Sequence, residues 1–160
     1  MNIHYYESLD INYNAKSIFL AGPTPRDVNV KSWRNEAVNI LKELNFDGDI
    51  YLPESKDRAI SDDFLTYNGV IDWELERLNA SKIILFWLPR DLKTLPGFTT
   101  NVEFGYHLKT GKIIYGRPDN APKTKYLDYL YEREYGKKPF NNLKDALKNA
   151  VELLKNQITF

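Results

Sequence analysis

Short apolar runs alternate with amphipathic helical patterns along this 160-residue chain. The longest run, residues 83–88, is apolar on both faces, as in a parallel strand that helices cover on either side. Strand–helix alternation with short connections predicts a doubly wound, flavodoxin- or Rossmann-like three-layer α/β sandwich with a mostly parallel sheet of about five strands. The strands that the pattern locates are residues 17–21, 50–52, 82–88 and 112–115.

Helices are predicted wherever apolar residues recur at a spacing of three or four. Asn142 and Asp145 can cap the start of the last helix. The length suits one domain. Residues 1–160 are therefore expected to fold as a unit, with residues 1–14 as a loose N-terminal extension. The predicted helices are residues 33–44, 70–78, 100–109, 125–135 and 143–154.

The charge balance argues against a broad nucleic-acid-binding surface. The chain has 22 Lys and Arg residues against 22 Asp and Glu residues, so no DNA or RNA partner is expected. Residues 123–138 are locally basic and contain several tyrosines, which keeps an RNA-associated protein open as a hypothesis. A solvated helix with packed tyrosines explains that segment as well.

Composition also limits the chemistry. The chain has no Cys, which excludes a disulfide framework, a thiolate zinc site and a Cys nucleophile. The two His residues, His4 and His107, are interpreted as structural or surface residues, so no metal site is predicted. No apolar run approaches the roughly 20 residues of a membrane span, and residues 1–14 lack the apolar core of a signal peptide. We expect a cytoplasmic protein without a membrane partner.

Ligands of a doubly wound sheet bind at the carboxyl ends of its strands. The loop after the first predicted strand contains Gly22, Pro23, Thr24 and Arg26. It can offer backbone N–H groups, a hydroxyl and a guanidinium to an anion. A tight Gly-Pro turn with a solvent-exposed arginine is the other interpretation.

A second segment at the same edge, residues 98–106, also has two interpretations. Thr100 and Glu103 match a capping box, in which the glutamate reaches back to the start of the helix. Alternatively, Glu103 lies in the first turn of that helix, where its carboxylate could attack a sugar carbon. Gly105 either lets a substrate or a neighbouring chain approach closely or packs the helix against a strand. The substrate-binding candidates of this segment are Phe98, Thr99, Thr100, Asn101 and Gly105.

The third segment is Asp72-Trp73-Glu74, on the helix before the strand at residues 82–88. Two carboxylates and an aromatic ring could supply a general acid and a stacking surface. A solvated helix face with a half-buried Trp73 is the alternative. Trp87, at the end of the strand, either lines a pocket or fills the core.

Together these segments resemble the nucleoside 2-deoxyribosyltransferase superfamily, and most closely its nucleoside 2-deoxyribosyltransferase-like branch. The resemblance extends over residues 17–154. Its most specific part is PGFTTNVEFG at residues 96–105, which looks like the helix-start motif of the family. The other matching blocks are residues 17–26, 32–34, 51–54, 73–74 and 83–89.

The resemblance implies that Glu103 is a nucleophile. It places a second carboxylate on the helix before the strand at residues 82–88. Lys82 stands where the family has an acid that opens this strand, so the matching place falls on Glu74, with Asp72 as a near alternative. The resemblance also implies that the loop at residues 22–26 contacts the sugar or a 5′-phosphate.

The implied activity is a double displacement at the N-glycosidic bond of a (deoxy)nucleoside or nucleotide, as in nucleoside salvage. A free base as acceptor would make the protein a transferase, and water would make it a hydrolase. No cofactor is required. A homo-oligomer is expected, because such enzymes often complete their site with residues of a neighbouring subunit. A second hypothesis is a non-catalytic nucleotide-binding or sensing module that uses the same pocket.

Overall fold

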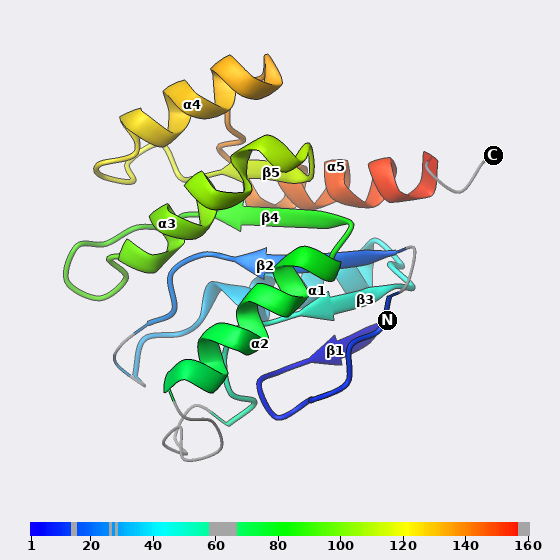
Figure 1. Cartoon of the computed structure of the whole chain (residues 1–160). Helices are drawn as coiled ribbons and strands as arrows, with labels where there is room; N and C mark the ends of the chain where they lie inside the picture. Colours follow the sequence, from blue (N-terminus) through cyan, green and yellow to red (C-terminus); the bar gives the residue numbers. More distant parts are fainter. Residues whose placement is uncertain (14–15, 26, 28, 58–66, 157–160) are drawn as a thin grey trace.

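A computed structural model describes residues 1–13, 16–25, 27, 29–57 and 67–156 of the chain. The strands in these residues are all parallel and form one sheet in the order β1-β3-β2-β4-β5 (Figure 1). This arrangement confirms the predicted doubly wound α/β class. The strands are β1 (Asn2–His4), β2 (Ser17–Ala21), β3 (Asp49–Tyr51), β4 (Ile83–Trp87) and β5 (Ile113–Gly116).

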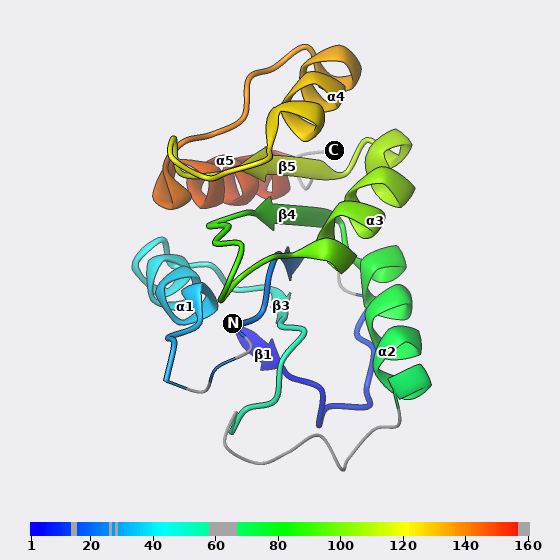
Figure 2. The ribbon, with the colours of Figure 1, turned by 90° about the vertical axis from the view of Figure 1, so that its left-hand side faces the viewer.

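Helices cover both faces of the sheet. Buried side chains of α1 and α5 pack on one face, and those of α2, α3 and α4 pack on the other. Figure 2 shows α1 and α5 on one side of the strands and α2 and α3 on the opposite side. The helices are α1 (Trp33–Glu43), α2 (Tyr67–Ala80), α3 (Phe98–His107), α4 (Lys125–Tyr135) and α5 (Leu143–Asn156), with a short 3-10 helix at Leu108–Thr110. Within the described residues, no helix combines the length and apolarity that crossing a bilayer requires.

The inner strand β4 shows why its sequence is apolar throughout. Ile83, Leu85 and Trp87 face the core beneath α1 and α5. Ile84 and Phe86 face the core beneath α2, α3 and α4. Because successive side chains point to opposite faces and both faces are covered, a polar residue anywhere in this strand would be buried.

The N-terminus departs from the predicted loose extension. Residues 2–4 form β1, which pairs with β3 and adds a fifth strand at the edge of the sheet. Asp49 of β3 fixes this edge, since its Oδ1 accepts hydrogen bonds from Asn2 at 3.1 Å and lies 2.8 Å from His4 Nε2. The prediction was wrong for this segment because a three-residue, half-exposed edge strand has no apolar alternation to reveal it.

Two predicted helix starts have different outcomes. The cap of α5 is confirmed, because the Asp145 N–H donates to Asn142 Oδ1 at 3.1 Å. The predicted capping box of α3 is wrong. The N-cap residue of α3 is Gly97, in the left-handed conformation and without a side-chain cap, and Thr100 lies buried inside the first turn. Glu103 consequently lies in the second turn of the helix rather than the first.

The strand order creates a crevice at one point of the sheet. β2 lies between β3 and β4, so the connections that follow β2 and β4 leave toward opposite faces. Ligands of doubly wound proteins bind at such a switch point, outside the carboxyl ends of the strands. The loop after β2 and the chain that leads from β4 into α3 meet there.

Candidate active site

A cavity of about 350 Å³ lies at this switch point. That volume is within the range of sites for small molecules. Its walls come from the loop after β2, from α2 and from the start of α3, which are far apart in the sequence. The lining residues are Gly22, Pro23, Thr24, Pro53, Val70, Ile71, Glu74, Pro96, Gly97, Phe98, Thr99, Thr100 and Glu103.

Two glutamates from different helices meet in this cavity. Glu74 projects from α2 and Glu103 from α3, and a side-chain hydrogen bond joins them. Burial, together with the neighbouring Glu74 charge, raises the pKa of Glu103 to about 8. Burial also raises the pKa of Glu74. The pair therefore holds a proton near neutral pH, as expected for two carboxyls that share a desolvated site.

Tyr6 belongs to the same cluster, although its segment lies outside every motif of the sequence. Its hydroxyl donates to Glu74 Oε1 at 2.5 Å. Burial and the nearby Glu74 charge raise the pKa of Tyr6 well above its ordinary value, so the hydroxyl keeps its proton. Sequence reasoning missed this residue because no local pattern relates the N-terminus to α2.

Arg34 supplies positive charge beside the two carboxyls. Its side chain is completely buried, and its charge opposes the upward shifts in the pKa values of Glu74 and Glu103. Its Nη1 lies 3.3 Å from Glu54 Oε2, which forms a buried ion pair. The sequence contained a signal for this pair, because both residues fall within the family-like blocks at residues 32–34 and 51–54.

The same guanidinium shapes the loop after β2. Arg34 donates to the carbonyls of Leu20 at 2.9 Å and Gly22 at 2.7 Å, and to Thr24 Oγ1 at 3.0 Å. Ser32 completes the network by donating to Glu54 Oε2 at 2.8 Å. These bonds satisfy a buried cation and fix the wall of the cavity at the same time.

Gly22 is required in this loop because the backbone passes too close to Trp87 and Trp33 to leave room for a side chain. A Cβ at this position would lie 2.3 Å from the carbonyl oxygen of Trp87 and 2.8 Å from the Trp33 ring. The Trp33 indole also donates to the Pro23 carbonyl at 3.1 Å. The loop is thus pressed against β4 and α1, which positions its Thr24 end at the cavity.

The structure separates the two acids that the sequence left open. Glu74 lines the cavity, whereas Asp72 is exposed to solvent and does not line it. Residues two positions apart on a helix point in different directions, so only one of the two can face Glu103.

The predicted roles of both tryptophans in substrate binding are not supported by their positions. Trp73 and Trp87 are 3% and 6% exposed, belong to the two cores and do not line the cavity. The Trp73 indole donates to the Ser8 carbonyl at 2.9 Å. Both residues are large apolar side chains on faces that the sheet buries, and this burial explains their positions.

The remaining candidates divide into two groups. Phe98, Thr99 and Thr100 line the cavity, as predicted. Asn101 does not, because its side-chain oxygen accepts a hydrogen bond from Arg90. A Cβ on Gly105 would meet nothing within 4 Å, so this glycine is not a packing contact between helix and strand, and it also lies outside the cavity lining. The predicted Arg26 lies outside the described residues.

Metal ligands do not gather in the parts of the chain that the structure describes. No group of three His, Asp or Glu side chains there is arranged to hold an ion. His107 is buried and lies on the same face of α3 as Phe104, which belongs to the core beneath α2, α3 and α4. The expectation that the chemistry needs no cofactor stays a prediction.

The fold and the site define a class, namely a doubly wound α/β protein with paired carboxyls in a small-molecule cavity at its switch point. The family model described as nucleoside 2-deoxyribosyltransferase like matches residues 15–121, so the chain belongs to this family. Membership supports a glycosyl-transfer enzyme at the level of the family.

Comparison with solved structures agrees with the fold. One similar chain is a 2-desoxiribosyltransferase from Leishmania mexicana, with a TM-score of 0.57 and 19% sequence identity. The match covers 86% of this chain and 97% of that chain. At this identity the likeness concerns the fold alone. No significant match is found among curated protein sequences.

Proposed function

We propose that this protein cleaves or transfers the N-glycosidic bond of a (deoxy)nucleoside or nucleotide through a glycosyl-Glu103 intermediate. The observation that carries the proposal is the Glu74–Glu103 pair, because the two carboxyls face one cavity from different helices and share a hydrogen bond. Paired carboxyls with different roles are the catalytic equipment of retaining glycoside chemistry. Family membership favours a nucleoside-type substrate over another glycoside.

In the first step, the Glu103 carboxylate attacks the anomeric carbon of the sugar. The bond from that carbon to the base nitrogen breaks, and the base leaves with the electron pair and takes a proton from Glu74. In the second step, a free base or water attacks the glycosyl ester. Glu74 removes a proton from this acceptor, and Glu103 leaves as a carboxylate.

The site can place one proton and one negative charge as this mechanism requires. Without substrate, the Glu103 carboxyl keeps the proton and donates a hydrogen bond to Glu74. Attack requires that proton to move to Glu74 along the shared hydrogen bond. The charge of Arg34 lowers the pKa of Glu103 against the effect of burial and thereby favours the reactive carboxylate.

We assign the rest of the cavity by the chemistry of its walls. Apolar surface from Val70, Ile71 and Phe98 suits the flat face of a base. The hydroxyls of Thr24 and Thr100 suit the sugar. The experiment below distinguishes a free base from water as the acceptor, nucleosides from 5′-monophosphates, and deoxyribose from ribose.

Chromatography of reaction products tests the proposal. Purified protein is incubated with a panel of 2′-deoxynucleosides, ribonucleosides and their 5′-monophosphates, each with and without a second free base. We expect free base or exchanged nucleoside from the wild type. Glu103→Gln should lose at least about 1,000-fold in turnover. Glu152→Gln, an exposed glutamate on α5, serves as the matched control and should retain wild-type turnover.

The acceptor dependence of product formation separates a transferase from a hydrolase. Full turnover by Glu103→Gln would contradict the assignment of the nucleophile. Ligand binding without any product from the wild type would support the alternative of a nucleotide-sensing module. The expected absence of RNA binding is checked in the same preparations by a salt-dependent binding assay.

We also propose a homo-oligomer. Phe98, Val102 and Tyr106 recur at every fourth position of α3, and each is at least 69% exposed. An apolar stripe of this kind beside the cavity is a surface that a second copy could cover. Light scattering coupled to size-exclusion chromatography measures the assembly, and a monomer at all concentrations would contradict it.

A further inference from the structure

The chain that follows β1 is held firmly along α2. Arg77 of α2 is 1% exposed and donates to the carbonyls of Ser8 at 3.1 Å and Leu9 at 2.8 Å. The Trp73 indole donates to the same Ser8 carbonyl, and the Arg77 guanidinium lies over the Trp73 ring at 4.5 Å. Charge-assisted bonds from a buried arginine make residues 5–10 a fixed strap.

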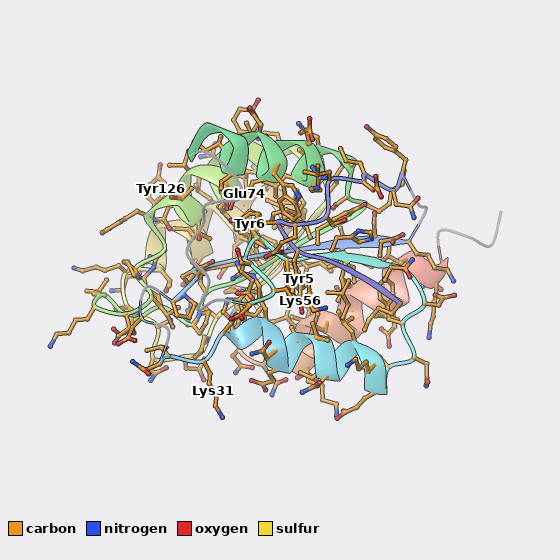
Figure 3. All side chains as sticks on the ribbon, turned by 90° about the horizontal axis from the view of Figure 1, so that it is seen from below. Tyr5, Tyr6, Lys31, Lys56, Glu74 and Tyr126 are labelled. Atoms are coloured by element: carbon orange, nitrogen blue, oxygen red, sulfur yellow. The ribbon has the colours of Figure 1, made fainter. Side chains whose placement is uncertain are left out.

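The strap lies beside the chain that follows β3, and this placement determines which of its side chains points toward α2. The Tyr6 N–H donates to the Glu54 carbonyl at 3.2 Å, which joins the strap to the chain that follows β3. Successive side chains point to opposite faces of a strand. Tyr5 accordingly packs on the core beneath α1 and α5, and Tyr6 packs on the core beneath α2 (Figure 3).

Tyr6 is held from two directions. Its ring meets the Trp73 ring edge-on, with centroids 5.0 Å apart. Its hydroxyl donates to Glu74, and the two residues are labelled near each other in Figure 3. The other groups that face Glu74 electrostatically are Glu103 and Arg34. Tyr6 keeps its proton, so it orients the Glu74 carboxyl without adding charge.

We propose that Tyr6 is a positioning residue for Glu74, supplied by a strap that precedes the part of the chain matched by the family. The matched part begins at residue 15. A carboxylic acid accepts hydrogen bonds through its carbonyl oxygen much better than through its hydroxyl oxygen. When the shared proton moves from Glu103 to Glu74, donation by Tyr6 to Oε1 therefore makes that atom the carbonyl oxygen and directs the acid proton to Oε2. This inference rests on the proposed function, in which Glu74 is the acid.

The test compares Tyr6→Phe with Tyr5→Phe. The first variant removes the hydroxyl and keeps the ring on Trp73. The second removes a hydroxyl from the neighbouring residue, which lies outside the cavity lining. We expect Tyr6→Phe to lower kcat about 10- to 100-fold, a part of what a general acid contributes. KM should change by less than about threefold, because Tyr6 does not line the cavity. Tyr5→Phe should retain the wild-type kcat.

A second readout does not depend on turnover. The carboxyl carbons of ¹³C-labelled glutamate are titrated by NMR, and the Glu74 signal is assigned by its loss in Glu74→Gln. The Tyr6 hydrogen bond lowers the pKa of Glu74, so that pKa should rise in Tyr6→Phe and stay unchanged in Tyr5→Phe. A structural role of the ring would leave this titration unaffected, because the ring is retained.

The outcomes distinguish the inference from the function on which it rests. Wild-type kcat and an unchanged Glu74 titration in Tyr6→Phe would overturn the role of Tyr6, while a dead Glu103→Gln would still support the proposed function. Absence of turnover in the wild type would overturn the function. The titration would then decide by itself whether Tyr6 orients Glu74.

Discussion

Glu103 of α3 donates a hydrogen bond to Glu74 of α2 across the cavity at the carboxyl ends of β2 and β4. The contact joins two helices that pack side by side on one face of the sheet (Figure 2). Two carboxyls that are joined by a hydrogen bond in a desolvated site share a proton at neutral pH rather than carrying two charges. The proposed reactivity and the predicted pH dependence both rest on this pair.

The first prediction concerns activity against pH. Turnover needs one proton on the pair, and the last proton leaves with a pKa of about 8, assigned to Glu103. We expect kcat/KM to fall above about pH 8, because the doubly ionised pair lacks an acid. Glu74→Gln should be slow and should lose this alkaline limb. A wild-type profile that stays flat to pH 10 would contradict the shared proton.

The second prediction concerns stability against pH. The pKa of Glu103 rises from 4.5 to about 8 on folding, so the folded state keeps a proton that the unfolded chain releases in this window. This contribution is complete below pH 4.5 and is lost as the pH rises through 8. A tenfold difference in proton affinity is worth about 1.4 kcal/mol. Between pH 5 and 9, the free energy of unfolding measured with urea should decline for the wild type and decline less for Glu103→Gln. Glu152→Gln should decline like the wild type.

The third prediction concerns the buried Arg34–Glu54 ion pair. Arg34→Met leaves the Glu54 carboxylate without its cation in a buried site, which typically costs about 3–5 kcal/mol of unfolding free energy. The double variant Arg34→Met/Glu54→Leu should recover part of this loss, because it removes the stranded charge. Chemical denaturation measures both. Lys31→Met, an exposed cation near the start of α1, is the control and should unfold like the wild type (Figure 3).

The fourth prediction contrasts two glycines. Gly22→Ala forces a methyl group against the Trp87 carbonyl, so it should lower the unfolding free energy by about 1–3 kcal/mol and distort the cavity wall. Gly105→Ala lies in an exposed helical position with free space around it. It should raise the unfolding free energy by about 0.5–1 kcal/mol. Thermal and urea unfolding compare the two, and equal effects would contradict the close approach at Gly22.

Local patterns predicted most of the secondary structure because they depend on neighbours in the sequence. The helix at residues 125–135 has the predicted bounds, and the strand at residues 17–21 does too. The predicted start of α3, at residue 100, was too late, because Thr100 and Glu103 match a capping box. The helix begins at Phe98, directly after the left-handed Gly97. β1 was missed because its partner β3 is remote in sequence and its own pattern is too short.

The sequence by itself determined the class of fold, the edge of the sheet at which the candidate site lies, and the two helices from which Glu74 and Glu103 project. These properties follow from periodicity and from the rule that ligands bind at the carboxyl ends of parallel strands. Only the tertiary structure decided that Glu74 rather than Asp72 faces the cavity, that Trp73 and Trp87 fill the cores, and that Tyr6 reaches the carboxyl pair. Each depends on the rotation of a helix or on contacts between remote segments, which packing determines and local sequence does not encode.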